Sequence, residues 1–143
     1  MLFERLRDLR EDKNITQEKV AEKIHVKRST YSGYEIGRDQ IPLPRLNLLA
    51  EFYEVSFDYI TGITDIKSNY KKVNIDAAII GKNLKNFRKK KHIKATEICK
   101  KLNINSSTYS AYETGKVIIQ TDFLYTIAKD YEYSLDKFLD KDN

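Results

Sequence analysis

The hydrophobic pattern of residues 1–62 is that of short amphipathic helices, since apolar side chains recur every three or four positions. Leu2, Leu6 and Leu9 share one face of a first helix, with charged residues on the other faces. The same spacing predicts four more helices, at about residues 17–24, 28–36, 44–53 and 57–61. A five-helix module of this size buries only about 60% of its unfolded surface, so its core depends on large side chains.

Polar residues at the ends of these predicted helices support the same boundaries. Thr16 and Ser56 stand where an N-cap hydroxyl would accept a hydrogen bond from an unpaired backbone amide. Gly37 follows the third helix as a C-terminal stop, because glycine adopts the left-handed conformation without steric cost. His25 ends the second helix at a position that also favours left-handed backbone, which histidine tolerates better than a β-branched residue.

The whole pattern occurs twice along the chain. Residues 28–37 recur as residues 106–115, at a constant offset of 78, and about a third of the positions in 4–62 match their partners in 82–140. A match at one fixed period indicates duplicated units. The sequence therefore predicts an all-α protein of two tandem five-helix domains. We expect one domain over 1–62, a polar linker over 63–75 and a second, divergent domain over 76–143.

Two short predicted helices, 17–24 and 28–36, follow each other with the spacing of a helix-turn-helix. The segments Thr16–Ala21 and Ser29–Gly37, the apolar run from Leu46 to Phe52 and the ending Val55–Ile60 resemble the phage repressor and Cro family of bacterial regulators, often called the XRE family. The resemblance implies a lambda-repressor-like fold in each copy. It also implies that the third helix lies in the major groove of DNA while the second braces across the phosphates.

Each candidate DNA contact in the first copy has side-chain chemistry that suits its role. Arg28 is the main candidate for reading a base, because arginine pairs bidentately with O6 and N7 of guanine. Gln17 stands at a helix N-terminus, where a phosphate is favoured. The full set of base candidates is Lys27, Arg28, Ser29, Ser32 and Gly33, and the phosphate candidates are Gln17 and Arg38.

Other prominent residues of the motif are better explained by packing. The spacing of Tyr31 and Tyr34 relative to the apolar face of the second helix makes them core residues. The family resemblance suggests that Glu35 pairs with Arg10, and the repeat supports this because the same two residue types recur 78 positions later as Arg88 and Glu113. Cys99 stands where the first copy has an alanine, which predicts a small buried residue.

The second copy keeps the core pattern and loses the reading residues. Gln17 becomes Ala95, and Lys27 and Arg28 become Asn105 and Ser106. This copy reads a different sequence, contacts DNA without reading it, or serves as a dimerisation or partner-binding domain. Its candidate DNA contacts are Lys89, Lys90, Lys91, Asn105, Ser106, Ser107, Ser110 and Lys116.

Charge and composition narrow the function further. The net charge of +5 is uneven, because residues 1–66 carry 10 basic and 12 acidic side chains whereas residues 67–143 carry 16 and 9. A basic half suggests attraction to phosphate. A single cysteine and two distant histidines predict neither a disulfide nor a metal site. We find no catalytic constellation or cofactor motif, so we expect no enzyme and no cofactor.

These observations predict a sequence-specific DNA-binding regulator of transcription, with repression by operator occupancy as its default mechanism. Its expected partner is double-stranded DNA, bound either by one chain that spans two half-sites or by a homodimer that reads a palindrome with the first unit. The alternative is an antitoxin or anti-repressor whose second domain mediates dimerisation or binds a toxin or another regulator. No apolar run approaches the roughly 20 residues of a membrane span and no signal peptide opens the sequence, so we expect a cytoplasmic protein without a membrane partner.

Overall fold

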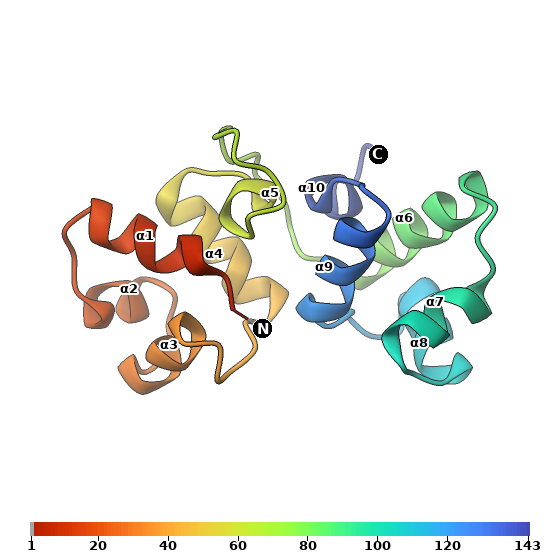
Figure 1. Cartoon of the computed structure of the whole chain (residues 1–143), viewed down its shortest axis with the longest axis horizontal. Helices are drawn as coiled ribbons and strands as arrows, with labels where there is room; N and C mark the ends of the chain where they lie inside the picture. The colour runs from red at the N-terminus through yellow and green to blue at the C-terminus, as the bar shows by residue number, and fades with distance from the viewer. Residues whose placement is uncertain (1) are drawn as a thin grey trace. The chain divides into compact units, whose positions relative to one another are not determined.

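The computed structural model describes residues 2–143, which divide into a first unit up to Lys72 and a second unit from Val73. Both units are helical, and the described residues contain no strand (Figure 1). The predicted all-α fold of two tandem helix-turn-helix domains is confirmed. The helices of the first unit are α1 (Glu4–Asp12), α2 (Gln17–Lys23), α3 (Arg28–Glu35), α4 (Leu43–Tyr53) and α5 (Phe57–Ile60). Those of the second unit are α6 (Ala77–Lys90), α7 (Ala95–Leu102), α8 (Ser106–Glu113), α9 (Thr121–Asp130) and α10 (Leu135–Leu139).

Capping side chains fix where several of these helices begin. The Thr16 hydroxyl accepts a hydrogen bond from the amide of Lys19 (3.1 Å), and Ser56 does the same for α5 and Ser134 for α10. Asp76 accepts two amides at the start of α6. The caps predicted at Thr16 and Ser56 are confirmed, and each of the four caps supplies a partner for an amide that the helix itself leaves unpaired.

The turn of each helix-turn-helix contains a residue in the left-handed region. His25 has φ of 60° in the first unit, and Asn103 has φ of 54° at the matching position of the second. Gly37 and Gly115, with φ of 76° and 77°, end the third helix of each unit in the same way. These conformations turn the chain sharply, so α2 and α3, like α7 and α8, pack against one another.

A pair of buried ionic groups joins the first and third helices in each unit. The Arg10 guanidinium donates to both carboxylate oxygens of Glu35, with Nε at 2.7 Å and Nη2 at 3.1 Å. Arg88 and Glu113 form the same fork, at 2.7 and 3.0 Å. The pairs that the resemblance implied are therefore present, and their bidentate geometry sets the angle between the helices.

Aromatic and branched side chains fill each core. Tyr31 and Tyr34 are 0% and 4% exposed, so their predicted placement in the core is confirmed. Tyr109 and Tyr112 occupy the same places in the second unit, and Cys99 is buried as expected. This packing turns the remaining faces of α3 and α8 away from the core.

The segment after α5 lies against the first unit. Arg5 donates from Nη1 to the carbonyls of Tyr59 and Thr64, both at 2.7 Å, and its guanidinium stacks over the ring of Tyr59. Further along, the Ser56 amide donates to the carbonyl of Ser68 (3.0 Å). The hydroxyl of Tyr70 donates to the side chain of Asn47 on α4 (2.8 Å). Residues 63–70 are thus held at several points to the domain that precedes them.

The first helix of the second unit starts earlier than its counterpart. Relative to α1, α6 has more than one additional turn at its N-terminus, and this turn crosses the C-terminal end of α8. Gly81 lies at the crossing, where a Cβ atom would collide with the carbonyl oxygens of Tyr112 and Glu113. Glycine is therefore needed for the two backbones to approach this closely.

Candidate nucleic-acid interface

The exposed face of α3 is the first part of the candidate interface. Helical periodicity places Ser29 and Ser32 on the side opposite Tyr31 and Tyr34, and Arg28 stands at the first position of the helix. Arg28 and Ser29 are exposed at the first turn, and Ser32 is half-buried one turn later. Lys27 precedes the helix as its exposed N-cap residue and makes no side-chain cap bond. This arrangement gives α3 a free polar face of the kind that enters a major groove.

Gln17 stands at the first position of α2 and is hydrogen-bonded to the buried ion pair. Its side-chain amide donates to Oε1 of Glu35 (3.1 Å), the same carboxylate that accepts from Arg10. A primary amide carries two N–H groups. One of them therefore serves Glu35, and the other is suited to a phosphate at the start of α2, where unpaired backbone amides also favour an anion.

The charge of Glu35 is maintained by its hydrogen bonds. Burial is the largest single influence and raises the pKa of this carboxyl, but its hydrogen bonds, above all those from Arg10, and the charge of Arg10 together outweigh burial, so the pKa is lowered. The pKa of Glu113 is lowered for the same reason, with Arg88 as the donor. Both carboxylates thus stay charged and hold the third helix of their unit to the first.

Arg38 and Asp39, just after α3, lie back over that helix. The Arg38 guanidinium donates to the carbonyl of Ser29 (2.8 Å) and to the carboxylate of Asp39 (3.0 Å). Gly33 lies beneath this pair and is buried by it. Arg38, predicted as a phosphate contact, is therefore paired with an acid in the free protein, and Gly33, predicted as a groove contact, is covered.

The matching face of α8 in the second unit has different chemistry. Asn105 is the N-cap of α8: its side chain accepts from the amide of Thr108 and the hydroxyl of Ser107, both at 2.8 Å. These bonds occupy two of the side chains that were candidates for reading bases. Ser106, Ser110 and Lys116 remain exposed. No basic residue lies within α8, so its face is uncharged.

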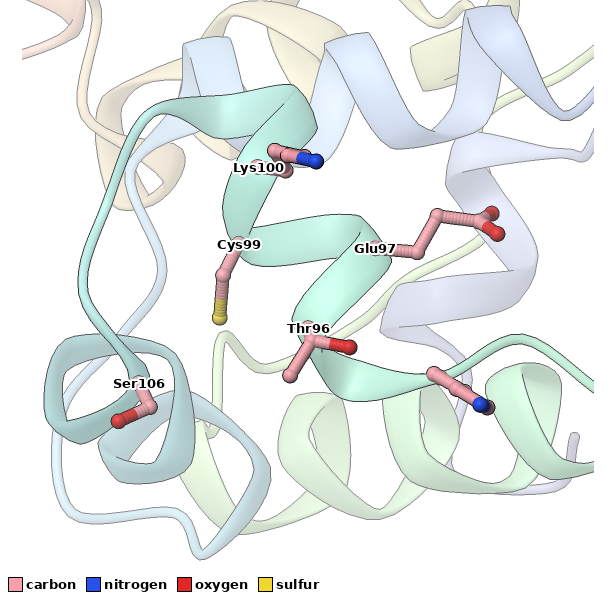
Figure 2. A pocket seen from close by; sticks show the side chains of 6 residues that line it. Thr96, Glu97, Cys99, Lys100 and Ser106 are labelled. Atoms are coloured by element: carbon pink, nitrogen blue, oxygen red, sulfur yellow. The ribbon is translucent and has the colours of Figure 1, made fainter.

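A cavity of about 510 Å³ opens between the starts of α7 and α8. Figure 2 shows the side chain of Cys99 pointing from α7 toward this space, and its sulfur lies 3.9 Å from the carbonyl of Asn105. The cavity is lined by Lys94, Thr96, Glu97, Cys99, Lys100 and Ser106. Glu97 accepts a hydrogen bond from the hydroxyl of Tyr131 (2.7 Å). Two lysines and two hydroxyls therefore line this space together with one carboxylate, so its lining carries charges of both signs.

Lys89, Lys90 and Lys91 form a second basic group at the end of α6. All three side chains are exposed, while Arg88 beside them is committed to Glu113. The sequence had indicated this cluster. The sequence had not indicated the cavity, because the space left between two helices depends on how the side chains of both helices pack. The cue available was the loss of bulk from Arg28 in the first copy to Ser106 in the second.

The fold and the exposed helix face define a helix-turn-helix DNA-binding protein. The sequence profile of the helix-turn-helix family matches residues 6–60 and again residues 84–138. The chain belongs to this family, in its Cro/C1 type, and carries two copies of its domain. The family resemblance predicted from the sequence is confirmed, and DNA-binding regulation of transcription follows as the general function.

Relatives support the same assignment. The chain is 42% identical over 93 residues to YobD of Bacillus subtilis, described as an uncharacterized HTH-type transcriptional regulator, covering 65% of this chain and 76% of YobD. It is 32% identical over 78 residues to the transcriptional activator BcrR of Enterococcus faecalis, covering 49% and 38% of the two chains. It is 40% identical over 55 residues to the phage CTXphi transcriptional repressor RstR of Vibrio cholerae, covering 38% and 50%.

The chain thus spans half or less of the activator and the repressor, and their activities are properties of those proteins. No solved structure is significantly similar to the chain. Within residues 2–143, no helix has both the length and the apolar character that crossing a membrane requires.

Proposed function

We propose that the chain is a cytoplasmic repressor that occupies an operator and reads its sequence with α3 of the first unit. The observation that carries this proposal is the exposure of Arg28 at the first turn of α3, beside the exposed Ser29. An arginine at this position reaches base edges and distinguishes guanine by a bidentate pair of hydrogen bonds. The proposed activity is DNA binding, and it involves no catalytic step.

The replacement Arg28→Ala tests this proposal. We expect it to weaken binding to the selected operator by about 1–3 kcal/mol and to spare binding to random DNA largely. The measurement is a titration of both duplexes at one fixed salt concentration. Arg7→Ala is the matched control, because it removes the same charge from the exposed surface of α1, where Arg7 pairs with Glu11. An equal loss on both duplexes would contradict the base-reading role.

We propose that the second unit contacts the phosphate backbone of DNA and does not read bases. The capping role of Asn105 and the uncharged face of α8 support this choice over a second sequence reader. Lys94 and Lys100 beside the cavity, and the cluster Lys89–Lys91, supply the positive charge. Phosphate contacts add affinity and orientation, whereas base contacts add specificity.

A second candidate function is protein binding by the second unit, either in a homodimer or with a toxin or another regulator. The observation that favours it is the exposure of Val117 and Ile118 just after α8, at 49% and 40%. The first unit has Asp39 and Gln40 at these positions. Sedimentation equilibrium of the whole chain gives the mass of one or two copies and decides whether a homodimer forms.

A further inference from the structure

The contact between Arg38, Asp39 and α3 restrains a charged residue beside the DNA-reading face. Arg38 makes three hydrogen bonds, one to the Ser29 carbonyl and two to Asp39 Oδ2, at 2.8, 3.0 and 3.3 Å. The amide of Asp39 donates to the carbonyl of Gly33 (3.1 Å), which fixes the backbone of the loop to the same helix. The pair is therefore attached to α3 through both side chain and main chain.

Gly33 makes this contact geometrically feasible. A Cβ atom added to Gly33 would overlap the carboxylate of Asp39 and the guanidinium of Arg38. Glycine is unfavourable within a helix by about 1 kcal/mol relative to alanine. The residue at this position thus allows the ion pair to lie directly on the helix backbone.

The second unit lacks all three parts of this arrangement. Gly33, Arg38 and Asp39 are replaced there by Ala111, Lys116 and Val117. The second unit thus has a Cβ atom where the first has Gly33, and it has no acid where the first has Asp39. Gly33 and the Arg38–Asp39 pair therefore occur together, and they occur in the first unit, whose third helix starts with an arginine.

We propose that Asp39 is a specificity-determining residue, which holds Arg38 away from DNA phosphates and so limits binding to random sequence. This inference rests on the proposed function of the first unit. A guanidinium already paired with a carboxylate releases no counterion from DNA, and the carboxylate itself repels phosphate. Affinity that does not depend on sequence is therefore reduced, while Arg28 on the same helix face is left to discriminate.

The replacement Asp39→Asn tests the proposal in the whole chain, because asparagine keeps the shape and removes the charge. We expect binding to a random duplex to strengthen about 5–10-fold near 0.1 M salt. The slope of log affinity against log salt should steepen by about 0.9, the value for one added phosphate contact. The preference for the operator over random DNA should fall by a comparable factor. Asp8→Asn makes the same charge change on the exposed surface of α1 and serves as the control.

Repeating Asp39→Asn in an Arg38→Ala background separates restraint of Arg38 from general repulsion. If Asp39 acts through Arg38, the gain disappears in this background and falls to that of the Asp8→Asn control. A gain of equal size with and without Arg38, or no gain beyond the control, would overturn the inference while wild-type binding still supported the proposed function. If no variant bound any duplex, both the proposed function and this inference would be overturned.

Discussion

At the scale of single residues, the carboxylate of Glu35 connects three helices of the first unit. It accepts hydrogen bonds from Arg10 on α1 and from Gln17 on α2, while its own backbone belongs to α3. The side chain is 3% exposed, so its charge is shielded from water and depends on these donors. Removing one partner of such a buried pair leaves the other charge uncompensated, which costs more than the pair itself contributes.

The lowered pKa of Glu35 makes the stability of the first unit dependent on pH. A carboxyl whose pKa is lower in the folded than in the unfolded chain stabilises the fold above its ordinary value of 4.5, and this contribution is lost as the pH falls below that value. We expect Glu35→Gln to reduce the free energy of unfolding by about 3 kcal/mol at neutral pH and to flatten the acid dependence.

Chemical unfolding at neutral pH and near pH 3.5 measures both effects. Glu11→Gln is the control, since Glu11 is half exposed in its pair with Arg7 and screened by water. An acid dependence in Glu35→Gln as steep as in the wild type would show that Glu35 does not carry it.

At the scale of elements, α6 differs from its counterpart in how it meets the third helix. Its added turn brings Gly81 against the carbonyl oxygens of Tyr112 and Glu113. These are main-chain atoms of α8, which cannot rotate away as the tip of a side chain can. The same replacement at Gly33 meets only the flexible ends of Arg38 and Asp39.

The variants Gly81→Ala and Gly33→Ala form a matched pair of helix substitutions. Helix propensity alone favours alanine by about 1 kcal/mol at both sites. We expect Gly81→Ala to destabilise the second unit by about 1–2 kcal/mol, because overpacking outweighs propensity. Gly33→Ala should leave stability equal or higher. Urea unfolding of each variant checks this, and stabilisation by both would contradict the close crossing of α6 and α8.

The elements that could be predicted from the sequence are those with local signals. The caps Thr16 and Ser56 and the left-handed His25 follow from residue type and position alone. Arg10 and Glu35 were found because the family and the repeat both connected them.

The contacts that could not be predicted join distant positions through side-chain conformation. Arg5 caps carbonyls at the end of α5, and at the matching position Asn83 binds the carbonyls of Phe138 and Asp140, both at 2.8 Å. Both side chains bind carbonyl groups near the last helix of their unit, but the residue type differs, so a comparison of the two copies does not reveal the shared contact. The Arg38–Asp39 contact depends on rotamers over Gly33, which a linear pattern does not encode.

At the scale of the whole molecule, the two similar units present different charged side chains to solvent. The first presents Arg28 on α3, and the second presents lysines at the end of α6 and beside its cavity. If both units contact one duplex, the first contact raises the local concentration of the second, so weak phosphate binding adds to overall affinity.

Neutralising Lys89, Lys90 and Lys91 together to glutamine tests the contribution of the second unit. Glutamine retains helix propensity at the end of α6. We expect the affinity of the whole chain to fall about tenfold or more for operator and random DNA alike near 0.1 M salt. The triple variant of Lys129, Lys137 and Lys141 to glutamine changes the net charge equally and should bind almost as the wild type. Unchanged affinity in the first variant would assign the second unit to protein contacts.

The attachment of residues 63–70 to the first unit shortens the flexible connection between the two units. The stretch between Tyr70, held by Asn47, and Asp76, the cap of α6, connects the two units. Six Cα steps reach at most about 20–22 Å, whereas one full turn of B-DNA advances by about 34 Å. If both units bind one duplex, this short connection limits how far along the DNA the phosphate contacts of the second unit can lie from the bases that α3 reads.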